Sequence, residues 1–384
     1  MRTKADLKAL QALPLDIKVS LTIDRIRQWV DEYGEDGVSV SFSGGKDSTV
    51  LLHLVRSIYP KVKAVFSNTG LEYPEIVEFV KTIDNVEWVK PKMTFGQVVT
   101  KYGYPMFSKE VSDAIWYARK LIGSKAGTSH RVEFNGERYQ NKRRDKLGGK
   151  MSEDGTEKSM FNKQKYLPAC RELPFLIGAN CCRKTKEEAL DEYQRRNHKK
   201  PFVATLMEES KRREQAWIRT GCNAFEGKKQ QSKPLSFWTE QDILRYIKDN
   251  DIEIASIYGN VVAQDKYGNQ YDDTLLPCGQ LRCTRASRTG CMYCAYGAGY
   301  EHRKLGKSRF ELLKEKHPQI YDYIMRGGQW VDNPYYDPTA PKVDPVDGWV
   351  NWNPKKIWVP STNGLGLKFV FDEVNRLMPD YIKY

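Results

Sequence analysis

Residues 43–48, Ser-Gly-Gly-Lys-Asp-Ser, lie between an apolar run and a helical pattern, and their types suit the binding of a phosphate. Gly44 and Gly45 let the backbone turn tightly, so that its N–H groups point at one spot. The helix expected from Lys46 presents its positive N-terminal end at that spot. Asp47 would either hold a magnesium ion or cap the helix. Further groups for phosphate oxygens are the Lys46 charge and the hydroxyls of Ser43 and Ser48.

This loop is not the P-loop of nucleoside triphosphatases, which requires Gly-x-x-x-x-Gly-Lys-Ser/Thr. Val40 stands where the first glycine belongs, and Asp47 follows the lysine. An ordinary strand–turn–helix junction also uses glycine pairs, so the pair alone is a weak sign. Its combination with two serines, Lys46 and Asp47 favours an anion site.

The eight cysteines are unevenly placed, and four of them have the spacing of metal ligands. Cys181 and Cys182 are adjacent, and Cys291 and Cys294 form a Cys-x-x-Cys pair. In an intracellular protein such thiols are more often ligands or reactive groups than disulfides. Four soft thiolates from two segments can enclose an iron–sulfur cluster or a tetrahedral zinc ion.

The other four cysteines carry weaker signals. We expect Cys170 and Cys222 to be ordinary small buried residues. Cys278 and Cys283 are alternative ligands, a second metal site or inert thiols, and the sequence leaves this open.

Strands and helices alternate around the glycine loop through short connections. This alternation predicts an α/β fold with a doubly wound parallel sheet, which binds ligands at the carboxyl ends of its strands. The strand patterns cover 38–43, 63–68, 86–91 and 201–207, and the helical patterns cover 19–34, 74–83, 95–103, 186–197, 239–250, 309–325 and 369–378, besides the helix from Lys46. Thr239 should cap the helix that it begins, and Trp238 should pack. Residues 328–360, rich in Pro and Trp, should wrap irregularly over the surface.

Between about residue 119 and residue 165 the alternation lapses into a polar, basic, glycine-punctuated insertion. Solvated surface is the plainer interpretation, and a basic arm over a nucleic-acid backbone is the sharper one. The formal net charge of +13 and the pI near 9.1 favour an anionic partner, either nucleotide or nucleic acid. No stretch has transmembrane length and the N-terminus lacks a signal-peptide core, so we expect a cytoplasmic protein without membrane contact.

The loop "SFSGGKDS" resembles the pyrophosphate-binding loop, Ser-x-Gly-Gly-x-Asp-Ser, of the adenine nucleotide alpha-hydrolase-like superfamily. "SNTGLEYPE" resembles the Asp-Thr-Gly-x-Glu signature of its phosphoadenosine phosphosulfate (PAPS) reductase branch, with Asn68 where that branch usually has Asp. "GYPMFSKEVS", "MEESKRRE" and "KPLSFWTEQDILRYI" resemble further motifs of the branch. The resemblance spans roughly residues 20 to 300.

The resemblance implies an adenine nucleotide, ATP or PAPS/APS, held in the loop with a possible Mg²⁺ ion. The residues that it implies are catalytic Lys46, Asp47, Lys109 and Arg213, and nucleotide-binding Ser43, Gly44, Gly45, Lys46, Asp47, Ser48, Asn68, Thr69, Gly70, Glu72, Glu209 and Ser210. Arg213 offers a planar fork for sulfate or phosphate. A solvated charged helix face is the competing interpretation of Glu209, Ser210 and Arg213.

"NCCRK" followed by "GCMYC" resembles the pattern of adenylyl-sulfate reductases, which bind a 4Fe–4S cluster through four cysteines. By that resemblance the ligands here are Cys181, Cys182, Cys291 and Cys294, with zinc as the alternative metal. Sulfonucleotide reductases also carry a nucleophilic cysteine near the C-terminus, in a Glu-Cys-Gly-x-His context. Here the last cysteine is Cys294, so reduction by the usual route would require Cys278 or Cys283 as a substitute.

Three functions follow. The favoured one is cleavage of ATP at its α-phosphate with release of pyrophosphate, coupled to sulfur transfer from a donor protein onto an acceptor such as DNA or tRNA. The second is a divergent PAPS or APS reductase with a relocated nucleophile. The third is a non-catalytic, zinc-stabilised nucleic-acid-binding protein. The expected organisation is an N-terminal helical segment (1–35), the α/β nucleotide-binding domain (36–255), an iron–sulfur segment (256–300) and a helical, wrapping C-terminal extension (301–384).

Overall fold

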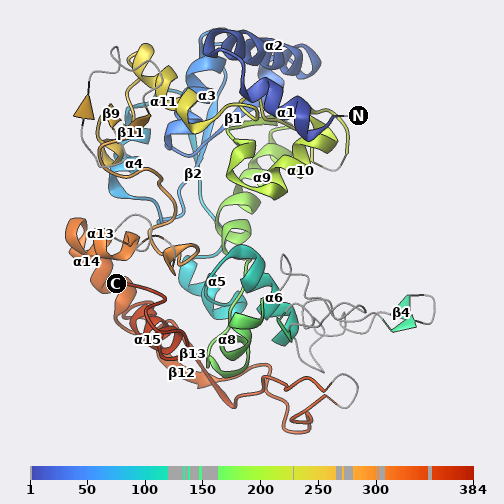
Figure 1. The fold of residues 1–384 in the computed structure, drawn as a ribbon, viewed down its shortest axis with the longest axis vertical. Helices are drawn as coiled ribbons and strands as arrows, with labels where there is room; N and C mark the ends of the chain where they lie inside the picture. The colour runs from blue at the N-terminus through green and yellow to red at the C-terminus, as the bar shows by residue number, and fades with distance from the viewer. Residues whose placement is uncertain are drawn as a thin grey trace. The chain divides into compact units, whose positions relative to one another are not determined.

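A computed structural model gives the fold (Figure 1). The residues that it describes are 2–119, 133–134, 137–138, 147–148, 163–227, 229–264, 270–271, 280–299, 301, 308–344 and 348–384. The chain forms two compact units, each built from two stretches of sequence: Met1–Lys92 with Lys186–Cys291, and Met93–Thr185 with Met292–Tyr384. The predicted α/β domain of residues 36–255 therefore contributes to both units. Most of the predicted insertion lies outside the described residues.

The first unit is built on a sheet in the order β3-β2-β1-β6-β8-β7. Its strands are β1 (Val38–Phe42), β2 (Ala64–Ser67), β3 (Val86–Val89), β6 (Lys200–Val203), β7 (Asn223–Ala224) and β8 (Gln231–Ser232). All neighbours are parallel except β7, which runs antiparallel to β8 at one edge. The predicted doubly wound α/β fold is confirmed.

Strand β1 lies at the point where the chain changes direction across the sheet. In register, Val40 faces Ala64 of β2 on one side and Phe202 of β6 on the other. From β1 the chain builds outward to β2 and β3, and then returns to place β6 on the opposite side of β1. Ligands of doubly wound sheets bind at such a switch point, beyond the carboxyl ends of the strands. The loop of residues 43–48 follows β1 there.

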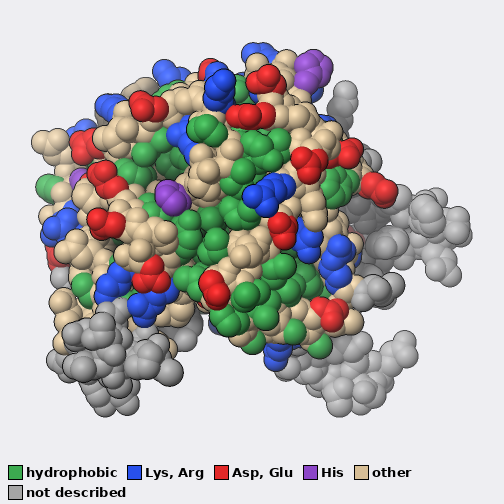
Figure 2. All heavy atoms as spheres, turned by 90° about the horizontal axis from the view of Figure 1, so that it is seen from above, with side chains coloured by type: hydrophobic (Ala, Val, Ile, Leu, Met, Phe, Trp, Pro, Cys, Tyr) green, Lys and Arg blue, Asp and Glu red, His purple; other side chains and the backbone are tan. Residues whose placement is uncertain are grey.

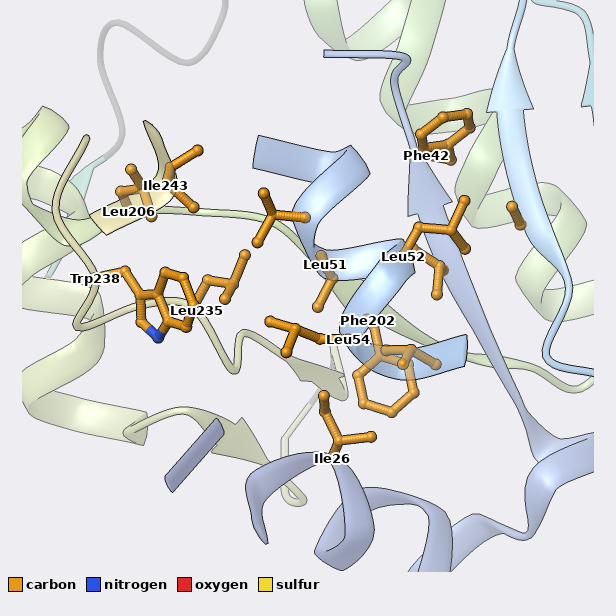
Figure 3. Packing of buried hydrophobic residues seen from close by; sticks show 14 of the residues in the cluster. Ile26, Phe42, Leu51, Leu52, Leu54, Phe202, Leu206, Leu235, Trp238 and Ile243 are labelled. Carbon is orange, nitrogen blue, oxygen red and sulfur yellow. The ribbon is translucent and has the colours of Figure 1, made fainter. Parts of the chain in front are cut away.

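Helices pack on this sheet because their apolar residues are buried on it. Helix α3 (Lys46–Arg56) is buried over most of its surface, and Leu51, Leu52 and Leu54 lie in the core with Phe202 and Ile26 (Figure 3). The other helices of the unit are α1 (Lys4–Gln11), α2 (Leu15–Tyr33), α4 (Pro74–Thr82), α9 (Glu188–Arg196), α10 (Lys211–Thr220) and α11 (Glu240–Asp249).

The segment before α11 confirms two local predictions. Thr239 accepts from the backbone N–H of Asp242 while the Asp242 carboxylate accepts from Thr239, which is a capping box. Trp238 is fully buried, and its indole N–H donates to Thr22 at 2.8 Å. A small antiparallel sheet of β9 (Val261–Gln264), β10 (Gln270–Tyr271) and β11 (Leu281–Cys283) completes the unit.

The second unit is mainly helical, with one antiparallel strand pair in its C-terminal part. Its elements are α5 (Phe95–Tyr102), α6 (Lys109–Arg119), β4 (Glu133–Phe134), β5 (Glu137–Arg138), α8 (Leu167–Glu172), α13 (Arg309–Lys316), α14 (Pro318–Met325), β12 (Gln329–Asp332), β13 (Lys356–Val359) and α15 (Leu367–Leu377). The single helix predicted over 309–325 is wrong, because the chain breaks at His317, where φ is −136°. Pro318 disfavours helical backbone at the residue before it.

The part of the chain that the structure describes contains no helix long and apolar enough to cross a membrane. On the face shown in Figure 2, Lys and Arg side chains are interspersed with Asp and Glu. The positive charge of the chain does not gather into one patch on that face.

Candidate functional site

The backbone of the glycine loop is fixed by close packing against α4. Gly44 has a φ of +69°, a region that residues with a side chain rarely adopt. A β-carbon there would lie 2.7 Å from Cγ2 of Ile76 and 2.8 Å from Cγ2 of Val80. Only glycine fits this position, and the turn that it makes directs the chain from β1 into α3.

The polar groups of the loop bond to one another. The hydroxyls of Ser43 and Ser48 are 2.9 Å apart, and the backbone N–H of Ser43 donates to the Ser48 hydroxyl at 3.2 Å. The N–H of Gly45 donates to the Ser43 hydroxyl at 3.3 Å, and the N–H of Lys46 donates to the Tyr258 hydroxyl at 3.3 Å. These donors point into the loop and are satisfied there by oxygen atoms of hydroxyl groups.

Lys46 is buried and lies among acidic and carbonyl oxygens. Its ammonium is 3.2 Å from the Glu240 carboxylate and 3.7 Å from that of Asp47, and it donates to the Ser287 carbonyl at 3.1 Å. Burial by itself would lower the pKa of Lys46, but Asp47 and Glu240 outweigh burial and raise the pKa above its ordinary value. Lys46 therefore carries a full positive charge at neutral pH.

Asp47 does not cap α3, because the N-cap residue is Gly45, which has no side chain to accept from the first N–H groups of the helix. Its Oδ1 atom is buried and has no hydrogen-bond partner in the described residues. The nearest cation is the Lys46 ammonium, which lies 3.7 Å from this oxygen, too far for a hydrogen bond, so the cost of burying the oxygen is only partly offset. Asp47 is thus the group at this site that is poised to accept a ligand.

Glu209, Ser210 and Arg213 lie together at the start of α10. The Ser210 hydroxyl caps α10 by accepting from the N–H of Arg213, and Glu209 pairs with Arg213 and, at 3.2 Å, with Arg288. Burial and the nearby Arg288 lower the pKa of Arg213, while Asp47 opposes them. The loop and α10 therefore share one electrostatic environment, in which Arg213 is influenced both by Arg288 and by Asp47 of the loop.

The second loop, residues 68–72, uses its acidic residue internally. The buried Glu72 carboxylate accepts from the N–H of Thr69 at 3.0 Å and from its hydroxyl at 2.8 Å, and it pairs with Lys186 at 3.0 Å. Asn68 accepts from the N–H of Gly70 at 3.3 Å. These bonds hold the loop in shape, so Glu72 serves here as a brace of the loop backbone.

Several residues of the site escaped the sequence analysis, namely Lys186, Glu240, Tyr258, Ser287, Arg288 and Thr289. The only local signal was the "SRT" directly before "GCMYC", where a serine, an arginine and a threonine adjoin proposed metal ligands. Tyr258 and Glu240 lie in segments whose patterns indicate packing and helix capping. Nothing in those patterns points to an anion site.

The remaining predicted residues belong mostly to the second unit. Lys109 is the exposed first residue of α6. Burial raises the pKa of Tyr296, and Cys181, Cys182 and Cys294 raise it further, so these three thiols lie within electrostatic range of Tyr296. Cys291 is the last residue of the first unit.

The cysteine site has a defined local backbone. Thr185 donates to the carbonyl of Cys181 at 3.0 Å within a short π-helical turn, Arg183–Glu187, and Tyr296 donates to the carbonyl of Gly178 at 3.1 Å. Among the described residues, no three His, Cys, Asp or Glu side chains are arranged to hold a single metal ion. The iron–sulfur and zinc assignments both stay predictions, as does Cys278, which lies outside the described residues. Cys170 and Cys222 are buried, as predicted.

A doubly wound sheet with a glycine loop beyond its switch-point strand is the architecture of many α/β nucleotide-binding proteins. Residues 37–296 match the sequence model of the phosphoadenosine phosphosulfate reductase domain. The chain belongs to this family, which indicates an enzyme that acts on sulfonucleotides.

Among solved structures, the chain is similar to phosphoadenylyl-sulfate (PAPS) reductase from Candida auris, in a phosphate complex. The two are 11% identical, with 67% of this chain and 91% of that chain covered and a TM-score of 0.33. At that TM-score the likeness adds nothing to the assignment. The comparison with curated proteins gave no match.

Proposed function

We propose that the chain binds the phosphates of ATP at residues 43–48, cleaves ATP at the α-phosphate and uses the adenylated acceptor for sulfur transfer. The observation that carries this proposal is the buried Asp47 oxygen without a hydrogen bond, beside Lys46 and within reach of the Arg213 charge. Mg²⁺ in nucleotide sites is typically held by one or two carboxylates together with substrate phosphates. The Asp47 carboxylate suits that role, and a bound Mg²⁺ ion would neutralise charge on the phosphates.

In the proposed reaction an acceptor oxygen attacks the α-phosphorus of ATP. The new oxygen–phosphorus bond forms as the bond to the bridging oxygen breaks, and pyrophosphate leaves with both electrons of that bond. Lys46 and Arg213 stabilise the negative charge that grows on pyrophosphate, while the loop N–H groups and the Ser43 and Ser48 hydroxyls orient it. Catalysis here is chiefly positioning and charge neutralisation.

We propose that Cys181, Cys182, Cys291 and Cys294 hold a 4Fe–4S cluster that takes part in sulfur delivery. Thiolate sulfur is the usual ligand of such clusters, and the influence of three of these thiols on the pKa of one residue, Tyr296, supports a common site. The acceptor that we propose is DNA or tRNA, because a net charge of +13 favours a polyanion. A separate protein would supply sulfide-level sulfur, which displaces AMP from the adenylated acceptor, and the former acceptor oxygen leaves as part of AMP.

The second candidate is a sulfonucleotide reductase, and membership of the family is the observation that favours it. It would need a relocated nucleophile. Cys283, at the end of β11, lies within the electrostatic reach of Lys46, but burial raises the pKa of its thiol and Lys46 only partly offsets this. A thiol with a raised pKa is a poor nucleophile at neutral pH, so the ATP reaction remains the first candidate.

The decisive experiment compares ATP and PAPS as substrates of the purified protein. Pyrophosphate release from ATP that tRNA or DNA stimulates supports the first candidate, and sulfite release from PAPS supports the second and overturns the first. Nucleic-acid binding without turnover of either nucleotide would favour a non-catalytic binding protein.

Gly45→Asp should abolish nucleotide binding, because a β-carbon there meets the Tyr258 hydroxyl at 3.2 Å and a negative charge enters the anion site. Unchanged affinity of this variant for both ATP and PAPS would rule out the loop as the nucleotide-binding site.

The cluster has its own test. Protein purified without oxygen should be brown and contain about four irons per chain. Cys182→Ser should lose the colour, while Cys170→Ser, at a buried cysteine within α8, should keep it. Stoichiometric zinc without iron would overturn the cluster.

A further inference from the structure

One backbone donor of the anion-binding loop is already occupied by a group from another part of the chain. The N–H of Lys46, the first of α3, donates to the Tyr258 hydroxyl at 3.3 Å. The first N–H groups of a helix have no partner within the helix and are the ones that bind phosphate oxygens. The Tyr258 oxygen thus stands where a ligand oxygen would be bound.

Tyr258 is held in that position from behind. It is 2% exposed, so water does not reach its ring, and its hydroxyl bonds the hydroxyl of Thr289. A β-carbon built on Gly45 would lie 3.2 Å from the Tyr258 hydroxyl and 3.6 Å from that of Thr289. Both hydroxyls therefore cover the glycine loop.

The same segment occupies the charged donor of the loop. The Lys46 ammonium donates to the carbonyl of Ser287 at 3.1 Å, two residues before Thr289. Residues 287–289 therefore act on both donors of Lys46. Thr289 bonds the Tyr258 hydroxyl that accepts from the Lys46 N–H, and the Ser287 carbonyl accepts from the Lys46 ammonium. A phosphate that used both donors would have to replace both oxygens.

We propose that Tyr258 and residues 287–289 form a latch that closes the phosphate site in the free protein and opens when a pyrophosphate group takes its place. The proposal rests on the proposed function of the loop, whose ligand is the pyrophosphate part of a nucleotide. Opening moves Thr289, which lies two residues before Cys291. Occupancy of the phosphate site is in this way transmitted to the first cysteine of "GCMYC".

The test measures binding of inorganic pyrophosphate to wild type and Tyr258→Phe by calorimetry. Phenylalanine keeps the buried ring and removes one oxygen, so the Lys46 N–H loses its partner only in the closed state. We expect pyrophosphate to bind the variant about fivefold to tenfold more tightly, which is the effect of one hydrogen bond that no longer has to be broken. The matched control is Tyr246→Phe, another buried tyrosine of the same core, whose hydroxyl contacts His53 instead. Its affinity for pyrophosphate should be that of wild type.

Two further measurements keep the test decisive. Thr289→Val removes the hydroxyl that bonds the Tyr258 hydroxyl, and it should also tighten the binding of pyrophosphate. Amide hydrogen exchange in residues 285–290 of the wild type should become faster when pyrophosphate saturates the protein. Unchanged or weaker binding to both variants, with normal binding to wild type, overturns the latch and leaves the loop as the site. Absence of pyrophosphate and ATP binding to every protein overturns the proposed function and the latch together.

Discussion

The two units of the chain each bury a cation, and they satisfy it in different ways. In the first unit the Lys46 ammonium lies among the Asp47 and Glu240 carboxylates and a single carbonyl. In the second unit the Arg119 guanidinium donates to four backbone carbonyls, those of Ala169, Cys170, Leu173 and Phe175. Its carbon also lies 4.3 Å from the centre of the Trp352 ring.

The difference separates a binding group from a structural one. Burial lowers the pKa of Arg119 to about 10, while the carboxylates around Lys46 raise its pKa. The partners of Arg119 belong to α8 and the turn after it, so they cannot leave without unfolding that segment. The partners of Lys46 are half-exposed side chains and one loop carbonyl, which an anionic ligand can replace.

The largest expected effect is the loss of stability on replacing Arg119. Arg119→Leu leaves four buried carbonyls without donors and should lower the free energy of unfolding by about 3 to 5 kcal/mol. Urea denaturation measures it. The control is Arg171→Leu, an exposed arginine 5.6 Å from the Trp349 ring, which should cost less than about 1 kcal/mol. Equal losses of the free energy of unfolding in the two variants would contradict the structural role assigned to Arg119.

Next in size is the effect of a methyl group at Gly44. Gly44→Ala combines a positive φ with contacts under 3 Å to Ile76 and Val80, and should cost about 3 kcal/mol. Gly70→Ala has a similar φ, +72°, but open space around the added carbon, and should cost only about 1 kcal/mol. The two unfolding curves therefore separate steric from backbone strain. Similar losses of stability in the two variants would mean that α4 shifts to accommodate the added methyl group at position 44.

Replacing Lys46 should affect binding more than stability. Lys46→Gln should weaken pyrophosphate binding about 100-fold, or about 2.7 kcal/mol, because a buried charge-assisted contact is lost. The free energy of unfolding should change by less than about 1 kcal/mol, since Asp47 and Glu240 reach water. The control is Lys63→Gln, which removes an exposed ion pair with Glu87. It should change neither the affinity for pyrophosphate nor the free energy of unfolding. A large loss of stability with intact binding would make Lys46 a structural cation like Arg119.

The smallest effect is a difference in the sign of pH dependence. Because the folded pKa of Lys46 is raised, its contribution to stability is present below its unfolded value of 10.5 and is lost as pH rises through the folded pKa. Arg119 has a pKa of about 10 in the folded protein and 12.5 in the unfolded chain. Between these two values the unfolded chain binds more protons than the folded protein, so the contribution of Arg119 to stability rises with pH.

Urea midpoints measured from about pH 9 to about pH 11 test this difference. Relative to wild type, Lys46→Gln should lose less stability over that range, and Arg119→Leu should lose more. Parallel curves for the two variants would show that the two cations do not differ in this way.

Local sequence patterns were enough for most of the first unit. Buried runs such as Val38–Phe42 and capping residues such as Thr239 act within one turn or one strand, so their consequences follow from neighbouring residues. The break between α13 and α14, which the single helix predicted over 309–325 missed, also has a local cause, because Pro318 restricts the residue before it. The tight turn at Gly44 belongs to the same category.

The sequence by itself determined that a tight glycine turn, a lysine and an aspartate follow a buried strand, and that two cysteine pairs accompany them. Only the tertiary structure decided how these groups are satisfied. Tyr258 reaches the N–H of Lys46 across 212 residues of chain, and Ser287 reaches its ammonium across 241. Such contacts arise when separate elements pack on one core, and no local pattern specifies which hydroxyl or carbonyl will face a buried donor. For the same physical reason, the exchangeable partners of Lys46 and the fixed partners of Arg119 became visible only in the folded chain.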